Sequence, residues 1–121
     1  MIEVGQRTEI RRRYDKHDAA TFAELSGQEG LQIEAVPEPL IGALFSYLLG
    51  VKLPGFGTNY LKQEMTFLRP APFDEDLTAS VEVTRIRTDK DLVDLATVCR
   101  TASGDEICTG RALVLVKDVG A

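Results

Sequence analysis

A run of apolar residues in the first half of the chain constrains the fold more than any other feature. The run Leu40–Leu49 carries apolar side chains nearly all round a helix, and such a helix must be covered by other parts of a protein. Pro39 suits its first turn, where the N–H that proline lacks would be unpaired. Gly50 is the predicted stop. The longest apolar stretch, Leu40–Val51, is about a dozen residues long, whereas a bilayer span needs about 20, so we expect a buried helix.

The second half of the chain has the period-two pattern of β-strands. Four segments are predicted strands, at residues 58–67, 77–87, 92–101 and 107–116, and the last three are rich in valine, threonine and isoleucine. A two-residue turn at Ser103 and Gly104 would place Cys99 opposite Cys108, and a three- or four-residue loop would change that register. We expect a pair of free thiols there, with a redox switch as the less favoured alternative.

The N-terminal part adds one strand and one helix. Thr8–Tyr14 is the predicted strand, and His17–Leu25 is the predicted helix, capped by Asp15 or Asp18. The element order predicts an α+β fold in which an antiparallel sheet wraps around the central helix. A single sheet leaves open edges and one open face, so we expect a dimer.

Composition limits the partners. A length of 121 residues predicts one domain over residues 1–121. The net charge of −5 argues against nucleic acid or an anionic membrane as the main partner, and we expect the run Arg11–Arg13 to be a solvated strand edge. Two cysteines and the single His17 match no zinc pattern, so no metal is predicted. Without an export signal, a reducing cytoplasm is the expected location.

Several blocks of sequence, in this order, resemble the MaoC-like (R)-specific enoyl-CoA hydratases. They are Val4–Gln6, Phe22–Ser26, Val36–Gly50, Leu53–Gln63 and Phe67–Val83. The resemblance covers nearly the whole chain and implies the hot-dog fold, which is usually a homodimer. It also implies that acyl-CoA thioesters bind in a tunnel at the dimer interface, with CoA entering as part of the substrate or ligand and no cofactor besides.

The chain departs from that family at its hydration motif. The family has an Asp, then Asn-Pro, then a His, just after the Leu-Ser that ends the first helix, and the Asp and His activate the water. In the simplest alignment, Gln28 stands at the Asp position, or Glu29 with a shift, and Gln32 stands at the His position. Neither glutamine exchanges a proton near pH 7. The segment before the central helix is also about ten residues shorter than the resemblance implies.

Two glutamates are therefore the alternative candidates for chemistry. Glu38 lies at the predicted N-terminus of the central helix, where free N–H groups suit an oxygen anion. Its carboxylate could cap the helix, or it could act as base or nucleophile in thioester hydrolysis, although it would repel a developing oxyanion. Glu29 is the other candidate, and a solvated loop charge is the more ordinary interpretation of it.

The resemblance also implies a set of substrate-binding positions. Thr58 and Leu61 match positions that line the acyl pocket of the hydratases, and Phe45 and Tyr47 of the central helix would bound it. Core packing is the competing interpretation for Phe45 and Leu61.

Three functions remain open at this point. The first is a protein that binds acyl-CoA thioesters without hydrating them, as a homodimer or paired with a catalytic paralogue. The second is a thioesterase that uses Glu38 or Glu29. The third is an active hydratase with atypical residues.

Overall fold

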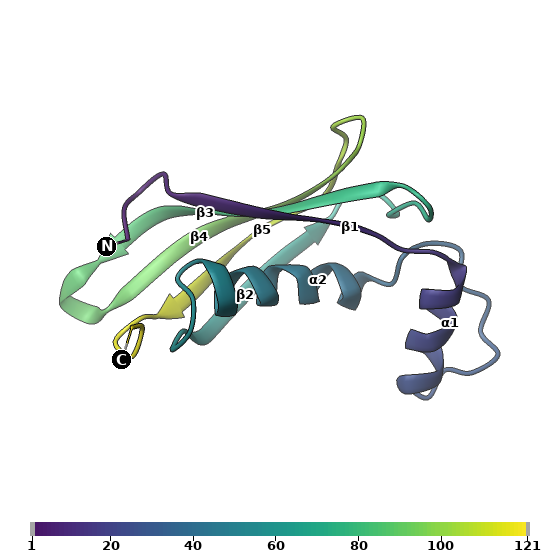
Figure 1. Ribbon diagram of the computed structural model, residues 1–121, viewed down its shortest axis with the longest axis horizontal. Helices are drawn as coiled ribbons and strands as arrows, with labels where there is room; N and C mark the ends of the chain where they lie inside the picture. Colours follow the sequence, from purple (N-terminus) through teal and green to yellow (C-terminus); the bar gives the residue numbers. More distant parts are fainter. Residues whose placement is uncertain (1, 121) are drawn as a thin grey trace.

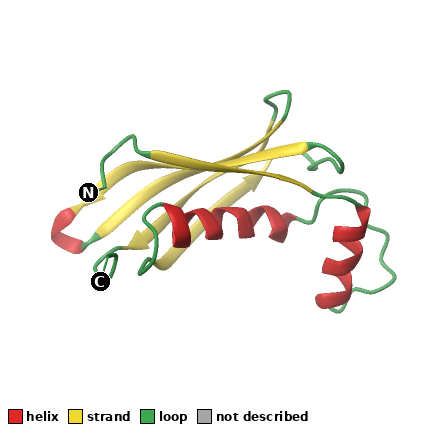
Figure 2. Ribbon diagram, in the orientation of Figure 1, coloured by secondary structure: helices red, strands yellow, loops and turns green. Residues whose placement is uncertain are grey.

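The computed structural model describes residues 2–120, which form a five-stranded antiparallel sheet and two α-helices (Figures 1 and 2). The strand order in the sheet is β1-β3-β4-β5-β2. The strands are β1 (Arg7–Arg13), β2 (Asn59–Phe67), β3 (Asp76–Arg87), β4 (Leu92–Thr101) and β5 (Glu106–Leu115). The helices are α1 (Lys16–Leu25) and α2 (Glu38–Tyr47), followed by a π-helical turn η1 (Leu48–Lys52) and a short 3-10 turn η2 (Thr88–Lys90). The predicted α+β architecture is confirmed.

The hydrophobic core lies between α2 and one face of the sheet. Helix α2 runs along that face, as Figure 1 shows, and buries Ile41, Leu44 and Phe45 against it. The sheet contributes alternate residues of its central strands, as expected for a strand with one buried face. These are Leu77, Ala79, Val81, Val83, Val93, Leu95, Cys99, Cys108, Ala112 and Val114.

The central helix extends beyond its predicted end. It begins at Glu38, and it continues beyond Gly50 as the π-helical turn η1. Leu48 and Leu49 are buried against the sheet, and the N–H of Leu53 donates to the carbonyl of Leu48 (N···O 2.8 Å). Burial of these two leucines therefore carries the helical backbone through Gly50, and the predicted stop there is wrong.

The prediction that this helix is enclosed on all sides is wrong for the single chain. The sheet covers only one side of α2, so Ser46 and Tyr47 remain exposed. The neighbouring edge strand β2 also exposes apolar side chains, among them Leu61, which is 53% exposed. An apolar surface on α2 and β2 is thus left open by this chain.

Helix α1 stands at one end of the sheet (Figure 1). Its N-terminus has a capping box, in which the side chain of Asp15 accepts from the N–H of Asp18 and the side chain of Asp18 accepts from the N–H of Asp15 (both 2.9 Å). Both predicted capping residues therefore act, reciprocally. No helix within residues 2–120 has the length and apolarity needed to cross a bilayer.

The two cysteines lie opposite each other on β4 and β5, as predicted, but the loop that joins these strands is longer than the two-residue turn on which the prediction rested. The loop between the strands has four residues, 102–105, and a register shift between Cys99 and Arg100 restores the Cys99–Cys108 pairing. Both thiols are free and fully buried. Burial raises the pKa of Cys99 to about 12 and that of Cys108 to about 11, with the neighbouring thiol adding to the shift of Cys99 and the carboxylate of Glu38 adding to that of Cys108.

These raised pKa values predict a loss of stability at high pH. Below pH 9, the ordinary thiol pKa, both states hold their thiol protons and the thiols contribute no pH dependence. From pH 9 to about 11, the unfolded chain releases those protons while the folded chain retains them, so the free energy of unfolding falls as pH rises. Urea unfolding at a series of pH values measures this slope. A Cys99→Ala/Cys108→Ala double variant should have a shallower slope, and an unchanged slope would contradict the assignment to the thiols.

Candidate functional site

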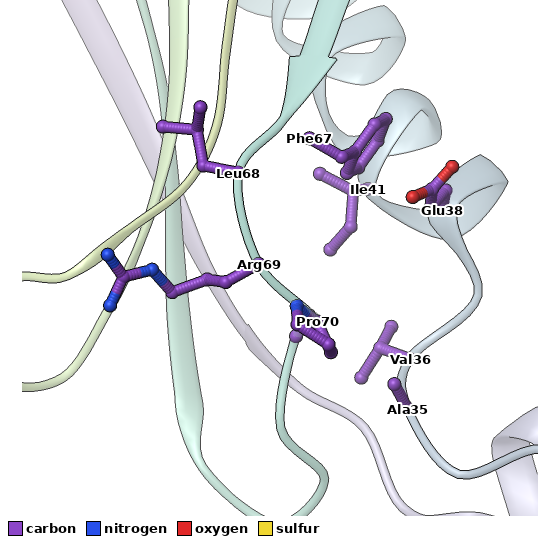
Figure 3. A pocket seen from close by; sticks show the side chains of 9 residues that line it. Ala35, Val36, Glu38, Ile41, Phe67, Leu68, Arg69 and Pro70 are labelled. Carbon is purple, nitrogen blue, oxygen red and sulfur yellow. The ribbon is translucent and has the colours of Figure 1, made fainter.

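A hollow at the N-terminus of α2 contains one of the predicted catalytic residues. This helix-end hollow has a volume of about 300 Å³ and is formed by the start of α2 and by the segment after β2 (Figure 3). The N–H of Val36 donates to the carbonyl of Ala71 (2.9 Å) and ties these two segments together. The lining residues are Ala35, Val36, Glu38, Ile41, Phe67, Leu68, Arg69, Pro70 and Ala71.

Glu38 supplies the only carboxylate of the helix-end hollow. The helix end itself has few free donors, because Pro39 has no N–H and the N–H of Leu40 donates to the carbonyl of Pro37 (3.0 Å). The N–H of Glu38 is left without a backbone partner among the bonds of residues 2–120. A backbone donor and a carboxylate of the same residue thus lie together at this helix end.

Arg69 lines the same hollow but does not neutralise Glu38. Its side chain extends away from Glu38 (Figure 3) and its Nη1 lies 3.7 Å from Oδ1 of Asp105, in the turn between β4 and β5. Phe67 and Ile41 lie on the side of Glu38 that faces Arg69, as Figure 3 shows, and Val36 is a further apolar lining residue. The floor of the hollow is therefore apolar, and its charge at the helix end is negative.

A second hollow, the loop hollow, contains two other predicted residues. It lies between α1 and the segment that follows it, has a volume of about 530 Å³ and is lined by Ala20, Ala23, Glu24, Glu29, Gly30, Leu31 and Gln32. Gln28 lines neither hollow, and its N–H donates to the carbonyl of Ala23 (2.6 Å). The structure thus brings Glu29 and Gln32 together and places Glu38 in a different hollow.

The predicted substrate-binding residues fall in three environments. Phe45 is fully buried in the core. The hydroxyl of Thr58 donates to the carbonyl of Gly55 (2.7 Å) and closes a turn of the loop before β2. Tyr47 and Leu61 lie on the exposed surface of α2 and β2. None of the four lines either hollow.

The structure adds residues that sequence reasoning missed. Glu24 joins Glu29 in the loop hollow, and Phe67 and Arg69 join Glu38 in the helix-end hollow. One sequence signal was available for the pair Glu24 and Glu29, because the two glutamates lie on either side of the predicted end of the first helix at Leu25. Residues 2–120 contain no group of three or more His, Cys, Asp or Glu side chains placed to hold a metal ion.

Comparison with known proteins decides the family. The (R)-specific enoyl-CoA hydratase of Aeromonas caviae is 35% identical over 126 aligned positions, which cover 93% of this chain and 94% of that protein. This chain belongs to the (R)-specific enoyl-CoA hydratase family. The solved structure of the A. caviae hydratase matches with a TM-score of 0.84 over 93% of this chain and 96% of that one. The predicted family and hot-dog fold are therefore confirmed.

Two further relatives agree with this assignment. The (R)-specific enoyl-CoA hydratase of Rhodospirillum rubrum is 29% identical and covers 95% of this chain and 88% of that protein. An unliganded R-hydratase structure from Pseudomonas aeruginosa is 30% identical, with a TM-score of 0.84 over 94% of this chain and 81% of that one. No protein-family model matches the chain.

The chain is shorter than its relatives within the matched region. The match to the A. caviae hydratase is 126 positions long but takes in 93% of 121 residues, about 113, so about 13 positions have no residue here. The R. rubrum match is 128 positions long and takes in 95% of 121, about 115, which again leaves about 13. A shortfall of this size is comparable with the missing segment predicted before the central helix.

Proposed function

We propose that this chain binds acyl-CoA thioesters but lacks the hydration step of its family. One observation carries the proposal: in the simplest alignment Gln28 stands at the position of the Asp of the hydration motif, or Glu29 with a shift, and Gln32 stands at the position of the His. Hydration needs a general base to activate water and an acid to return the proton, and a carboxamide does neither near pH 7. The shortfall of about 13 residues supports the same conclusion.

The helix-end hollow is the proposed binding place for the thioester. Its apolar floor of Val36, Ile41 and Phe67 suits an acyl chain, and the N–H of Glu38 is a donor for the thioester oxygen. The carboxylate of Glu38 opposes the formation of negative charge on that oxygen, which weakens this site as an oxyanion hole. Binding without turnover is the outcome that this arrangement favours.

Glu38 also supports a second candidate function, thioester hydrolysis. Its carboxylate could take a proton from a water molecule whose oxygen then bonds to the thioester carbon. The carbon–sulfur bond breaks in the following step, and the CoA thiolate leaves and takes up a proton. Glu29 is less suited to this role, because it lies in the loop hollow with Glu24 and away from the apolar floor.

Assays with crotonyl-CoA and a panel of short acyl-CoA thioesters distinguish these functions. We expect calorimetry to show binding, with no water addition to crotonyl-CoA and no release of free thiol above the buffer rate. Water addition would contradict the proposal and identify an active hydratase. Thiol release that falls by about 100-fold or more in Glu38→Gln, the loss expected for a missing general base, would instead establish the thioesterase. Glu34→Gln is the matched control, because Glu34 is exposed and lines neither hollow.

We also propose that the open apolar surface of α2 and β2 is covered by a second protein chain, either a second copy or a catalytic paralogue. Exposed apolar side chains next to an unpaired strand edge favour this. Light scattering on the purified chain should give about 27 kDa, twice 13.3 kDa. Leu61→Arg should reduce this to the monomer, whereas Leu25→Arg, an exposed site on α1, should not. A mass of one chain for the unchanged protein would rule out the homodimer.

A further inference from the structure

A hollow on the opposite face of the sheet gathers three arginines. It has a volume of about 200 Å³ and is lined by Thr84, Arg85, Arg87, Asp94 and Arg111. Asp94 lies between Val93 and Leu95, which both belong to the core under α2. Because side chains alternate along a strand, Asp94 points to the face away from α2. This arginine hollow is therefore separated from the helix-end hollow by the sheet itself.

A buried carboxylate contacts two of the three arginines of this hollow. Asp94 is only 7% exposed, and its Oδ2 accepts from Nη2 of Arg87 at 2.7 Å. Its Oδ1 lies 4.0 Å from Nη2 of Arg111. The Nε of Arg87 is also buried, and it has no hydrogen-bond partner. Leaving such a donor unpaired costs free energy.

The hollow also has more positive than negative charge. Three guanidinium groups face one carboxylate, which leaves a surplus of two charges. The nearest carboxylates along the row of Arg111 are Glu82 and Glu64. Each has a cation of its own: Arg7 lies 4.0 Å from Glu82, and Lys62 lies 3.2 Å from Glu64. The surplus on the arginine hollow therefore remains available to a ligand.

We propose that Arg85, Arg87 and Arg111 form a binding site for a phosphoryl group. The planar fork of a guanidinium group pairs with two oxygens of a phosphate at once, and Asp94 holds Arg87 in place for this contact. The phosphoryl group has two possible sources with the same chemistry, a free phosphate or the phosphorylated nucleotide end of a CoA molecule. Because it lies on the other face of the sheet, this site is independent of the proposed thioester site.

Amide NMR titrations with two probes, inorganic phosphate and adenosine 3′,5′-bisphosphate, test the proposal. Saturable shifts are expected at residues 84–87, 94 and 111. Equal affinity for both probes identifies a simple phosphate site, and much tighter binding of the bisphosphate identifies a nucleotide site. Absence of saturable shifts at these residues with either probe would overturn the proposal.

Two arginine variants separate a built site from general attraction of anions. Arg111→Gln removes an exposed side chain and should weaken binding about tenfold, since a hydrogen bond to a charged group is lost. Arg100→Gln is the matched control, because Arg100 lies on the same strand face as Asp94 and pairs with Glu106 (2.9 Å). It should change the affinity less than about twofold, as expected for a screened surface charge. Equal weakening by both variants would overturn the proposal. Circular dichroism of both variants checks that the fold is intact.

Discussion

Gly110→Ala is expected to lower the free energy of unfolding by about 3 kcal/mol or more. A Cβ atom on Gly110 would collide with the backbone carbonyl of Glu64 and would come within 3.1 Å of the Cα of Met65. Both obstacles are backbone atoms of β2, so no side-chain rotation relieves the clash. The edge strand must move away from β5, and its ladder of hydrogen bonds is lost or distorted. Urea unfolding followed by circular dichroism measures the change.

Gly50→Ala is the matched control for this substitution. A Cβ on Gly50 meets no atom within 4 Å, and the residue lies in the helical turn η1 without a positive φ. Alanine there should leave stability unchanged or raise it by up to about 1 kcal/mol, since alanine favours helical backbone over glycine. Similar stabilities for the two variants would contradict the close approach of β2 to Gly110.

Phe45→Ala is expected to cost about 3–5 kcal/mol. Phe45 has no exposed surface and lies in the core between α2 and the sheet. Truncation to alanine removes most of the ring's burial and leaves a cavity that the surrounding strands cannot close. The midpoint of urea unfolding should fall sharply, with the slope of the transition unchanged.

Phe56→Ala is the control that separates the loss of core burial from the general effect of removing a phenylalanine ring. Phe56 is 77% exposed in the loop before β2, so its truncation should change stability by no more than about 0.5 kcal/mol. Phe45→Leu keeps most of the buried volume and should retain acyl-CoA binding if Phe45 only supports the core. A stable Phe45→Ala variant that has lost acyl-CoA binding would instead make Phe45 a wall of the acyl pocket.

The sequence predicted the architecture because burial patterns are local. The all-apolar run from Leu40 and the alternating strands after residue 58 each specify one element, and their order leaves few folds. The end of the central helix was mispredicted because glycine permits a helix to stop but does not require it. Contacts of Leu48 and Leu49 with the sheet decided that end, and these contacts arise only in the folded chain.

The candidate sites were harder to predict, since they depend on how segments meet. Glu29 and Glu38 are nine positions apart in sequence, and only the path of the intervening segment places them in separate hollows. The pairing of Arg87 with Asp94 was missed for a similar reason. It depends on the irregular register of β3 and β4 between Val83 and Arg85, which no local pattern shows.

The two edge strands of the sheet differ in their exposed side chains. This difference determines whether further copies of the chain can add to both edges or to only one. The outer strand β1 ends in the exposed cationic triplet Arg11–Arg13, which repels a like strand. The other outer strand, β2, presents Leu61 and Met65 among its exposed side chains. A chain whose two edge strands can both pair with other copies can form a filament, whereas a chain with one such edge can only form a dimer. The exposed arginine side chains of β1 therefore disfavour pairing of this edge with the same edge of a second copy.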